Sequence, residues 1–338
     1  MRRSPFAALG IGLAALGLVL TGCATPAPVE TPAASSPAEP TPTIEPVVIG
    51  PAEMPPVAFG GDCAKVLTTD DLFEVTGIEF ALQDGVEDNP VTDNVVANVG
   101  GLECSWAGGD SEVYLDTIPQ AGLDGTRFPH VEDYFEECDR VAPGCGWYQS
   151  GDALWTSVYF ATPGVTREQA DVWGEELGRR VAENHTATAA EPWTRDRSGW
   201  WPVFDCAQIA AAVNAQAGDA LLVGEVDGFR GGPGPEMARE ASRETQCTLT
   251  SPEGAEIVRM TTRAGVGDVS DSSTTMTPVD SGVPGISMSL GGDEGGGTEW
   301  YVLSDGVNTV RLSASASALN SPEELALAVA AAAASGFE

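Results

Sequence analysis

The cysteines of this sequence follow a repeated spacing. Cys63 and Cys104 lie 41 residues apart, and so do Cys206 and Cys247. Both first cysteines stand in the tripeptide Asp-Cys-Ala, and both second cysteines open a stretch of strand-forming residues. The second pair follows the first by 143 residues. We interpret this pattern as a tandem duplication of one module.

The repeat predicts two disulfides, Cys63–Cys104 and Cys206–Cys247, because an even number of cysteines in an exported chain is typical of a disulfide framework. Cys138 and Cys145 remain, and we expect them to form a short third disulfide that belongs to the first copy alone. A metal site is the alternative for this pair. The spacing of Cys138 and Cys145 matches no common zinc pair, however, and His130 is the nearby imidazole. We therefore expect no metal and no cofactor.

The N-terminus has the form of a lipoprotein signal. Arg2 and Arg3 precede an apolar run over residues 6–20, which is shorter than the roughly 20 residues that a membrane-spanning helix needs. The run ends in Leu20-Thr21-Gly22-Cys23, which matches the bacterial lipobox, with cleavage before Cys23 and transfer of a diacylglycerol to its thiol. A plain secretory signal with an incidental cysteine is the alternative. Two acyl chains on one residue anchor a protein stably, so we expect attachment to the outer, extracytoplasmic face of the cell membrane through Cys23.

The sequence divides into five parts. Residues 24–56 hold 10 of the 24 prolines, and proline favours an extended, semi-rigid chain. The expected organisation is a signal peptide (1–22), a lipidated cysteine with a Pro-rich disordered spacer (23–56), a first module (57–186), a linker (187–201) and a second module (202–338).

Each copy predicts the same order of elements. A helix follows the Asp-Cys-Ala tripeptide, an irregular acidic segment comes next (77–101 and 218–244), and alternating apolar residues then indicate strands. Both copies close with a helix, at 170–184 and 325–334, after capping boxes that begin at Thr166 and Ser321. The expected fold class is α+β, with two tandem helix–antiparallel sheet–helix sandwich modules stapled by disulfides.

Short motifs in the first copy resemble a known family. The hexapeptide CAKVLT at 63–68 and the tripeptide CSW at 104–106 resemble the C-x-L-L-T … C-x-W pattern of actinobacterial cell-envelope lipoproteins of unknown function. The resemblance covers residues 57–185 well and 200–338 weakly, because Leu249 stands where tryptophan is usual and Gln208-Ile209-Ala210 replaces Leu-Leu-Thr. It implies a secreted, disulfide-stapled α+β module on a lipid anchor, and it implies no activity and no catalytic residues.

The charge of the chain argues against several kinds of partner. The sequence has 50 acidic and 16 basic side chains and a formal net charge of −34. Nucleic-acid binding normally requires a basic face, so we expect no nucleic-acid partner. Attraction to anionic lipid headgroups is disfavoured for the same reason.

Motifs that could support catalysis are weak. Gly291-Gly292-Asp293-Glu294 resembles the tetrapeptide of cyclic-dinucleotide synthases, but a Gly-rich loop between strands explains it better. Ser–His–Asp catalysis would need His130 or His185, and the sequence contains no G-x-S-x-G elbow. We therefore expect no enzymatic activity and no catalytic residues.

Two further groups could bind ligands. Four acids could hold calcium through oxygen, although they lack the spacing of a calcium loop and a solvated acidic face is the plainer interpretation. A set of aromatic residues could stack on a sugar or anchor a partner, with core packing and packing between the two copies as the alternatives. The acids are Asp84, Glu87, Asp88 and Asp93, and the aromatic residues are Trp147, Tyr148, Trp155, Trp193, Trp200 and Trp201.

The function expected from these features is that of a non-enzymatic envelope lipoprotein that binds a protein or a small ligand at the cell surface. One alternative is a secreted hydrolase that uses a pair of acidic residues, as glycosidases do. Another is a structural scaffold of the cell surface.

Overall fold

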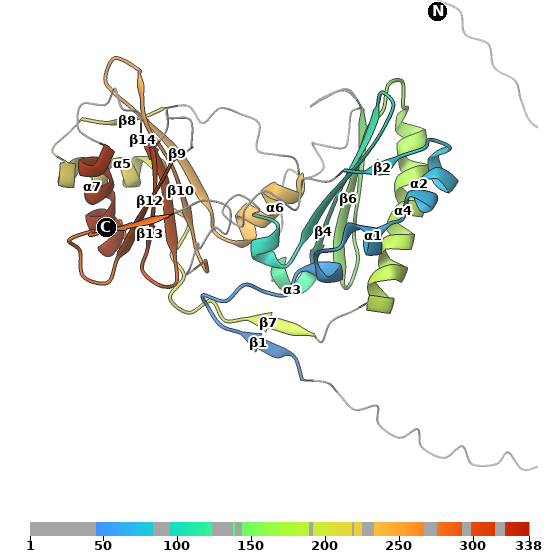
Figure 1. The fold of residues 1–338 in the computed structure, drawn as a ribbon, viewed down its shortest axis with the longest axis horizontal. Coiled ribbons are helices and arrows are strands. Elements are labelled where there is room, and N and C mark those ends of the chain that lie inside the picture. Colours follow the sequence, from blue (N-terminus) through green and yellow to red (C-terminus); the bar gives the residue numbers. More distant parts are fainter. Residues whose placement is uncertain are drawn as a thin grey trace, which may run out of the picture. The chain divides into compact units, whose positions relative to one another are not determined.

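A computed structural model describes most of the chain beyond residue 44 (Figure 1). Among the described residues the strands form sheets of two, five and seven strands. The described residues are 45–83, 95–123, 138, 144–188, 192–217, 220–224, 233–266, 276–292, 299–314 and 322–337.

The five-stranded sheet is antiparallel, with the strand order β2-β3-β4-β6-β5. Its strands are β2 (Ala81–Leu82), β3 (Leu102–Gly108), β4 (Ser111–Pro119), β5 (Cys145–Ser150) and β6 (Leu154–Ala161). In β3, buried Cys104 and Trp106 alternate with the less buried Glu103 and Ser105, so one face of the sheet lies in the core. That face packs against α1 (Cys63–Val66), α2 (Thr69–Thr76) and α4 (Arg167–Thr188), and α4 lies along the sheet (Figure 1).

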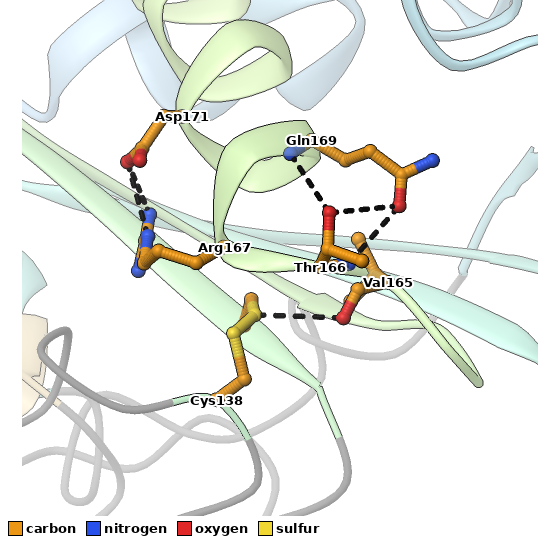
Figure 2. Close-up of a disulfide and its surroundings, with 7 residues drawn as sticks. Cys138, Val165, Thr166, Arg167, Gln169 and Asp171 are labelled. Atoms are coloured by element: carbon orange, nitrogen blue, oxygen red, sulfur yellow. Dashed lines mark hydrogen bonds and ion pairs between the residues drawn. A yellow bond between two sulfur atoms is a disulfide. The ribbon is translucent and has the colours of Figure 1, made fainter. Parts of the chain in front are cut away.

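Two of the helices that cover this sheet begin at capping boxes, and the sequence predicts the one at Thr166. The Thr68 hydroxyl accepts from the Asp71 N–H, and the Asp71 carboxylate accepts from the Thr68 N–H at 2.8 Å, which forms a capping box. Thr166 and Gln169 make the same exchange at the start of α4 (Figure 2). The predicted helix over 170–184 is confirmed, and it extends from Arg167 to Thr188.

The seven-stranded sheet is also antiparallel, with the order β11-β12-β13-β14-β10-β9-β8. Its core contains Leu249, Met260 and Leu312 from the strands and Val213 and Val329 from two helices. Those helices are α5 (Cys206–Ala217) and α7 (Pro322–Ala334). The strands are β8 (Leu222–Val223), β9 (Thr245–Thr250), β10 (Glu256–Arg263), β11 (Thr277–Val279), β12 (Ser287–Gly292), β13 (Glu299–Ser304) and β14 (Thr309–Ala314).

The predicted disulfides are confirmed, and the fold is mixed α+β with antiparallel sheets. Cys63–Cys104 and Cys206–Cys247 each join the start of a helix to a strand, with Cα–Cα distances of 5.7 and 5.5 Å. Cys138–Cys145 is the third disulfide within the described residues. Cys145 Sγ lies 3.7 Å from the Val165 carbonyl oxygen, next to the first turn of α4 (Figure 2).

The spacer prediction is wrong for its last residues. Residues 45–56 belong to the ordered structure, in which β1 (Val47–Ile49) pairs in parallel with β7 (Trp193–Arg195) of the expected linker. A strand can form in this Pro-rich stretch because Val47, Val48 and Ile49 are strand-forming residues between two prolines. The 3₁₀ helix η1 (Ala58–Gly61) follows. The linker is thus part of a small sheet.

The prediction of an irregular segment over 218–244 is also wrong. This stretch contains β8 and the helix α6 (Pro233–Ala241). Met237, Ala238 and Ala241 of α6 form a buried cluster with residues of the five-stranded sheet, Ile118 and Trp155. The 3₁₀ helix η2 (Ala97–Val99) and the short helix α3 (Gln120–Leu123) contribute Val99 and Leu123 to the same cluster. In the chain that the structure describes, no helix combines the length and apolar character needed to cross a bilayer.

Candidate functional site

Several residues singled out from the sequence lie outside the described residues. These are Cys23, His130, Asp293, Glu294, the acidic set from Asp84 to Asp93, and Ser321. The six other cysteines are paired in the three predicted disulfides. In the described part of the chain, no group of three or more His, Cys, Asp or Glu side chains is arranged to hold a metal ion.

His185, Gly291 and Gly292 are the members of the weak catalytic motifs that lie within the described residues. His185 lies in the last turn of α4, where its ring packs edge-on against Phe59 at 5.6 Å and burial lowers the pKa of the imidazole. Gly291 and Gly292 belong to β12 and pair with β13, so the predicted loop is wrong for these two glycines. Gly291 packs closely against Trp300 of β13.

The aromatic residues lie in two kinds of place. Trp147 packs against α4 at Gly174 and Gly178, and Trp155 is buried beneath α6. Trp193, Trp200 and Trp201 of the expected linker lie where β1, β7 and the start of the second module meet. These positions fit packing rather than an exposed stacking platform.

Trp200 is surrounded by arginines. The guanidinium carbons of Arg195, Arg197 and Arg243 lie 4.8, 5.1 and 5.9 Å from its ring centroid, within cation–π range. The Trp200 indole N–H donates to the Pro51 carbonyl at 2.9 Å. This cluster fastens the end of the predicted spacer to the linker.

Arg195 joins three distant parts of the chain. Its guanidinium donates to the carbonyls of Asn98, Glu53 and Gly265. Burial, followed by repulsion from Arg197, lowers the pKa of Arg195 to about 10. Arg195 is therefore charged at neutral pH, and its role in this arrangement is structural.

An acidic pair lies on the second face of the five-stranded sheet. Glu103 of β3 and Asp116 of β4 stand directly opposite each other in the antiparallel register, where side chains approach within about 5 Å. Burial first, and the Asp116 charge second, raise the pKa of Glu103 to about 8, although Arg239 acts in the opposite direction. Burial raises the pKa of Asp116 to about 6. The pair therefore holds a proton at neutral pH.

Two donors hold the Asp116 carboxylate. The Ser157 hydroxyl of β6 donates to it at 3.0 Å, and the Gly234 N–H in the first turn of α6 donates to it as well. A Cβ added at Gly234 would lie 2.3 Å from Asp116 Cγ, so the α6 backbone rests on the carboxylate. The N-terminus of a helix favours an anion, and Asp116 is accordingly the member of the pair suited to carry the charge.

A second buried carboxylate lies just beyond α6. The Glu244 side chain is 0% exposed and binds Arg239 Nε at 3.2 Å and Arg263 Nε at 2.7 Å. Gln246 Nε2 also donates to it at 2.7 Å. This region therefore contains the three carboxyl groups of Glu103, Asp116 and Glu244 and the two guanidinium groups of Arg239 and Arg263.

Glu103 and Asp116 could not be identified as a buried pair from the sequence. Side chains along a strand point alternately to the two faces of the sheet. Glu103 and Asp116 alternate with core residues, so they point to the second face, which in an antiparallel sheet normally contacts water. The α6 helix that covers them comes from more than 110 residues further along the chain. A short helix whose first turn contains Pro233 and Pro235 gave no signal that it would cover the sheet.

A surface groove lies apart from the acidic pair. Its volume is about 670 Å³, and it runs along α4 from Val172 to Thr186 beside Gln149 of β5. Three glutamates and one arginine line it, and the Val172 residue is 62% exposed. Arg179 bridges Glu176 and Glu183 across this helix surface.

No protein-family model, curated protein or solved structure matches the chain. The resemblance to actinobacterial envelope lipoproteins therefore stays a prediction from the two short motifs. Any functional argument has to come from the residues of this chain.

Proposed function

We propose that the chain is a non-enzymatic lipoprotein of the cell envelope, anchored at the outer face of the cell membrane through Cys23, that binds an envelope protein or a small ligand. The observation that supports it best is the set of three disulfides. Disulfides persist in oxidising compartments, and the lipobox provides the export signal for such a compartment. The Pro-rich residues up to 44 then serve as the tether.

The lipid anchor is tested by Cys23→Ser. The native chain should incorporate labelled palmitate and sediment with membranes, and the variant should do neither. Ser36→Ala, in the same N-terminal region, is the matched control and should behave like the native chain. Membrane association that persists in Cys23→Ser would contradict the anchor.

We also propose that the two parts of the chain are copies of one module. Support comes from the strand order, because β2-β3-β4-β6-β5 corresponds to β8-β9-β10-β14-β13 in chain order and pairing. Each disulfide of 41-residue separation also joins the equivalent helix and strand, α1 to β3 and α5 to β9. An experimental structure with a different pairing order in either sheet would remove this support.

The groove along α4 is the surface on which we place the binding of a partner. A photo-cross-linking residue at Val172, inside the groove, should capture an envelope component from intact cells. The same residue at Val203, which is 56% exposed and outside the groove, should not. Equal capture at both positions would contradict the groove, and no reproducible capture at either would favour the scaffold alternative.

The acidic pair supports a second candidate function, that of a hydrolase. Glu103 and Asp116 stand directly opposite each other, where Cβ atoms lie about 5 Å apart, and two close carboxyl groups are the catalytic pair of retaining glycosidases. The α6 backbone covers Asp116, however, which leaves that carboxylate without open space for a substrate. If the hydrolase candidate is correct, Glu103→Gln should abolish hydrolysis of envelope glycans by the purified chain; absence of activity in the native chain argues against it.

A further inference from the structure

The contact between α6 and the five-stranded sheet contains more carboxyl groups than cations. Glu103 and Asp116 face α6 from β3 and β4, and Arg239 of α6 is the cation that acts on Glu103. Glu244 binds both Arg239 and Arg263. The other segments in this cluster, η2 and α3, contain no charged residue. If all three carboxyls were ionised, they would carry one negative charge more than Arg239 and Arg263 can balance.

Hydrogen bonding distinguishes the two acids of the pair. Asp116 accepts from Ser157 and from the first turn of α6, and both interactions are stronger when the Asp116 carboxyl is ionised. Glu103 has Asp116 directly across the strand pair, where two like charges are destabilising. A neutral Glu103 removes that repulsion, and the negative charge of the pair then lies on Asp116 at the N-terminus of α6.

The helix itself is held by a modest apolar contact. Met237, Ala238 and Ala241 pack on Ile118 and Trp155, and α6 spans nine residues. A short helix with three small or flexible anchors buries little apolar surface, so one added buried charge is enough to shift its docking equilibrium.

We propose that α6 is a proton-dependent cover of the five-stranded sheet: it docks while Glu103 carries a proton, and release of that proton to solvent undocks it. The undocked state would expose Trp155, Ile118 and the acidic pair. This inference does not depend on the lipid anchor or on a binding partner.

The direction of the pH effect follows from linkage. Glu103 binds a proton more tightly with α6 docked than with α6 released into water. Docking is therefore strongest at pH values below the ordinary pKa of a glutamate, and it is lost as the pH rises through the raised value. Below about pH 6 Asp116 also takes up a proton. Between that pH and the raised pKa of Glu103, the undocked fraction should rise by up to about tenfold per pH unit.

The test is hydrogen–deuterium exchange of the amides of 233–241 in the full-length chain at pH 5.5, 6.5 and 7.5, corrected for the intrinsic rate. The native chain should show exchange that accelerates by up to about tenfold per unit. Glu103→Gln, which imitates the neutral acid, should stay protected at all three values. Asp110→Asn, an exposed acid in the turn of the same hairpin, should follow the native chain.

A second variant keeps the proposal testable if Glu103→Gln folds poorly. Asp116→Asn removes the charge that opposes Glu103. The pKa of Glu103 with α6 docked should then be lower, so the exchange of 233–241 should stop accelerating at a lower pH than in the native chain. Exchange of 233–241 that is independent of pH in the native chain would overturn the proposal. So would a Glu103→Gln variant with the native pH dependence.

Discussion

The indole of Trp147 lies flat against the backbone of α4 at Gly174. A Cβ added at Gly174 would come within 2.2 Å of Trp147 Cγ, and one at Gly178 within 2.2 Å of Trp147 Cη2. The two glycines lie one turn apart and form a flat strip on the helix. This contact fixes the long helix α4 against the edge strand β5.

The first prediction concerns this contact. Gly174→Ala should destabilise the protein, because overpacking in a close contact costs about 1–3 kcal/mol, which exceeds the gain of about 1 kcal/mol in helix propensity. Urea unfolding monitored by circular dichroism measures the change. Glu175→Ala, exposed and adjacent on the same helix, should change the free energy of unfolding by less than about 0.5 kcal/mol. A stabilised Gly174→Ala variant would show that the indole can move away.

The second prediction compares two disulfides. Replacing Cys206 and Cys247 together by alanine opens a loop with a sequence separation of 41 and should cost about 4 kcal/mol in the chain-entropy model. Replacing Cys138 and Cys145 opens a separation of 7 and should cost only about 2.5 kcal/mol. Unfolding in urea of both double variants gives the comparison. Equal losses of unfolding free energy in the two double variants would mean that packing in the native state, rather than loop closure in the unfolded state, determines what each disulfide contributes.

The third prediction is a pH dependence at the start of α2. Burial raises the pKa of Asp71, but the hydrogen bonds with Thr68 and the Arg180 guanidinium outweigh it and leave the pKa below its ordinary value of 3.8. The lowered pKa gives stability above about pH 4 that is lost as the pH falls. Asp71→Asn should therefore cost about 1–2 kcal/mol at pH 7, and the difference from the native chain should shrink below pH 4.

Asp70 offers the control for this measurement. It is exposed and stands next to Asp71 in the first turn of the same helix. Asp70→Asn should leave the free energy of unfolding within about 0.5 kcal/mol of native at both pH values. A loss for Asp71→Asn that is the same at pH 3 and pH 7 would separate the capping role from the charge.

The sequence predicts the fold best where a local signal and the tertiary contacts agree. The capping box at Thr166 marks a helix that does begin there, and the repeated cysteine spacing predicts two disulfides and leaves Cys138 and Cys145 to form the third. Strand alternation places Cys104 and Trp106 in the core. These features depend on residues near one another in sequence or on one covalent bond.

The parts that could not be predicted depend on contacts between distant residues. Strand β1 exists through its pairing with β7, about 146 residues away, and its surroundings are rich in proline. The α6 helix starts with Pro233-Gly234-Pro235, which usually indicates a turn. Glu103 and Asp116 are buried because α6 covers them. Without a prediction of α6, the sequence could not show that these two acids form a buried pair.

The fourth prediction tests the junction around Arg195. Arg195→Lys keeps the positive charge but loses the planar fork that reaches the carbonyls of Asn98, Glu53 and Gly265. Unsatisfied carbonyls and lost charge-assisted hydrogen bonds should together cost about 2–3 kcal/mol. The β1–β7 pair should open first, because Arg195 ends β7. Limited proteolysis within residues 45–56 should accordingly be faster in the variant than in the native chain.

Arg167→Lys is the control for this measurement, because Arg167 pairs with Asp171 on the exposed surface of α4. This variant should be cleaved at the native rate. Equal cleavage rates in the native chain and both variants would show that β1 stays paired with β7 without Arg195.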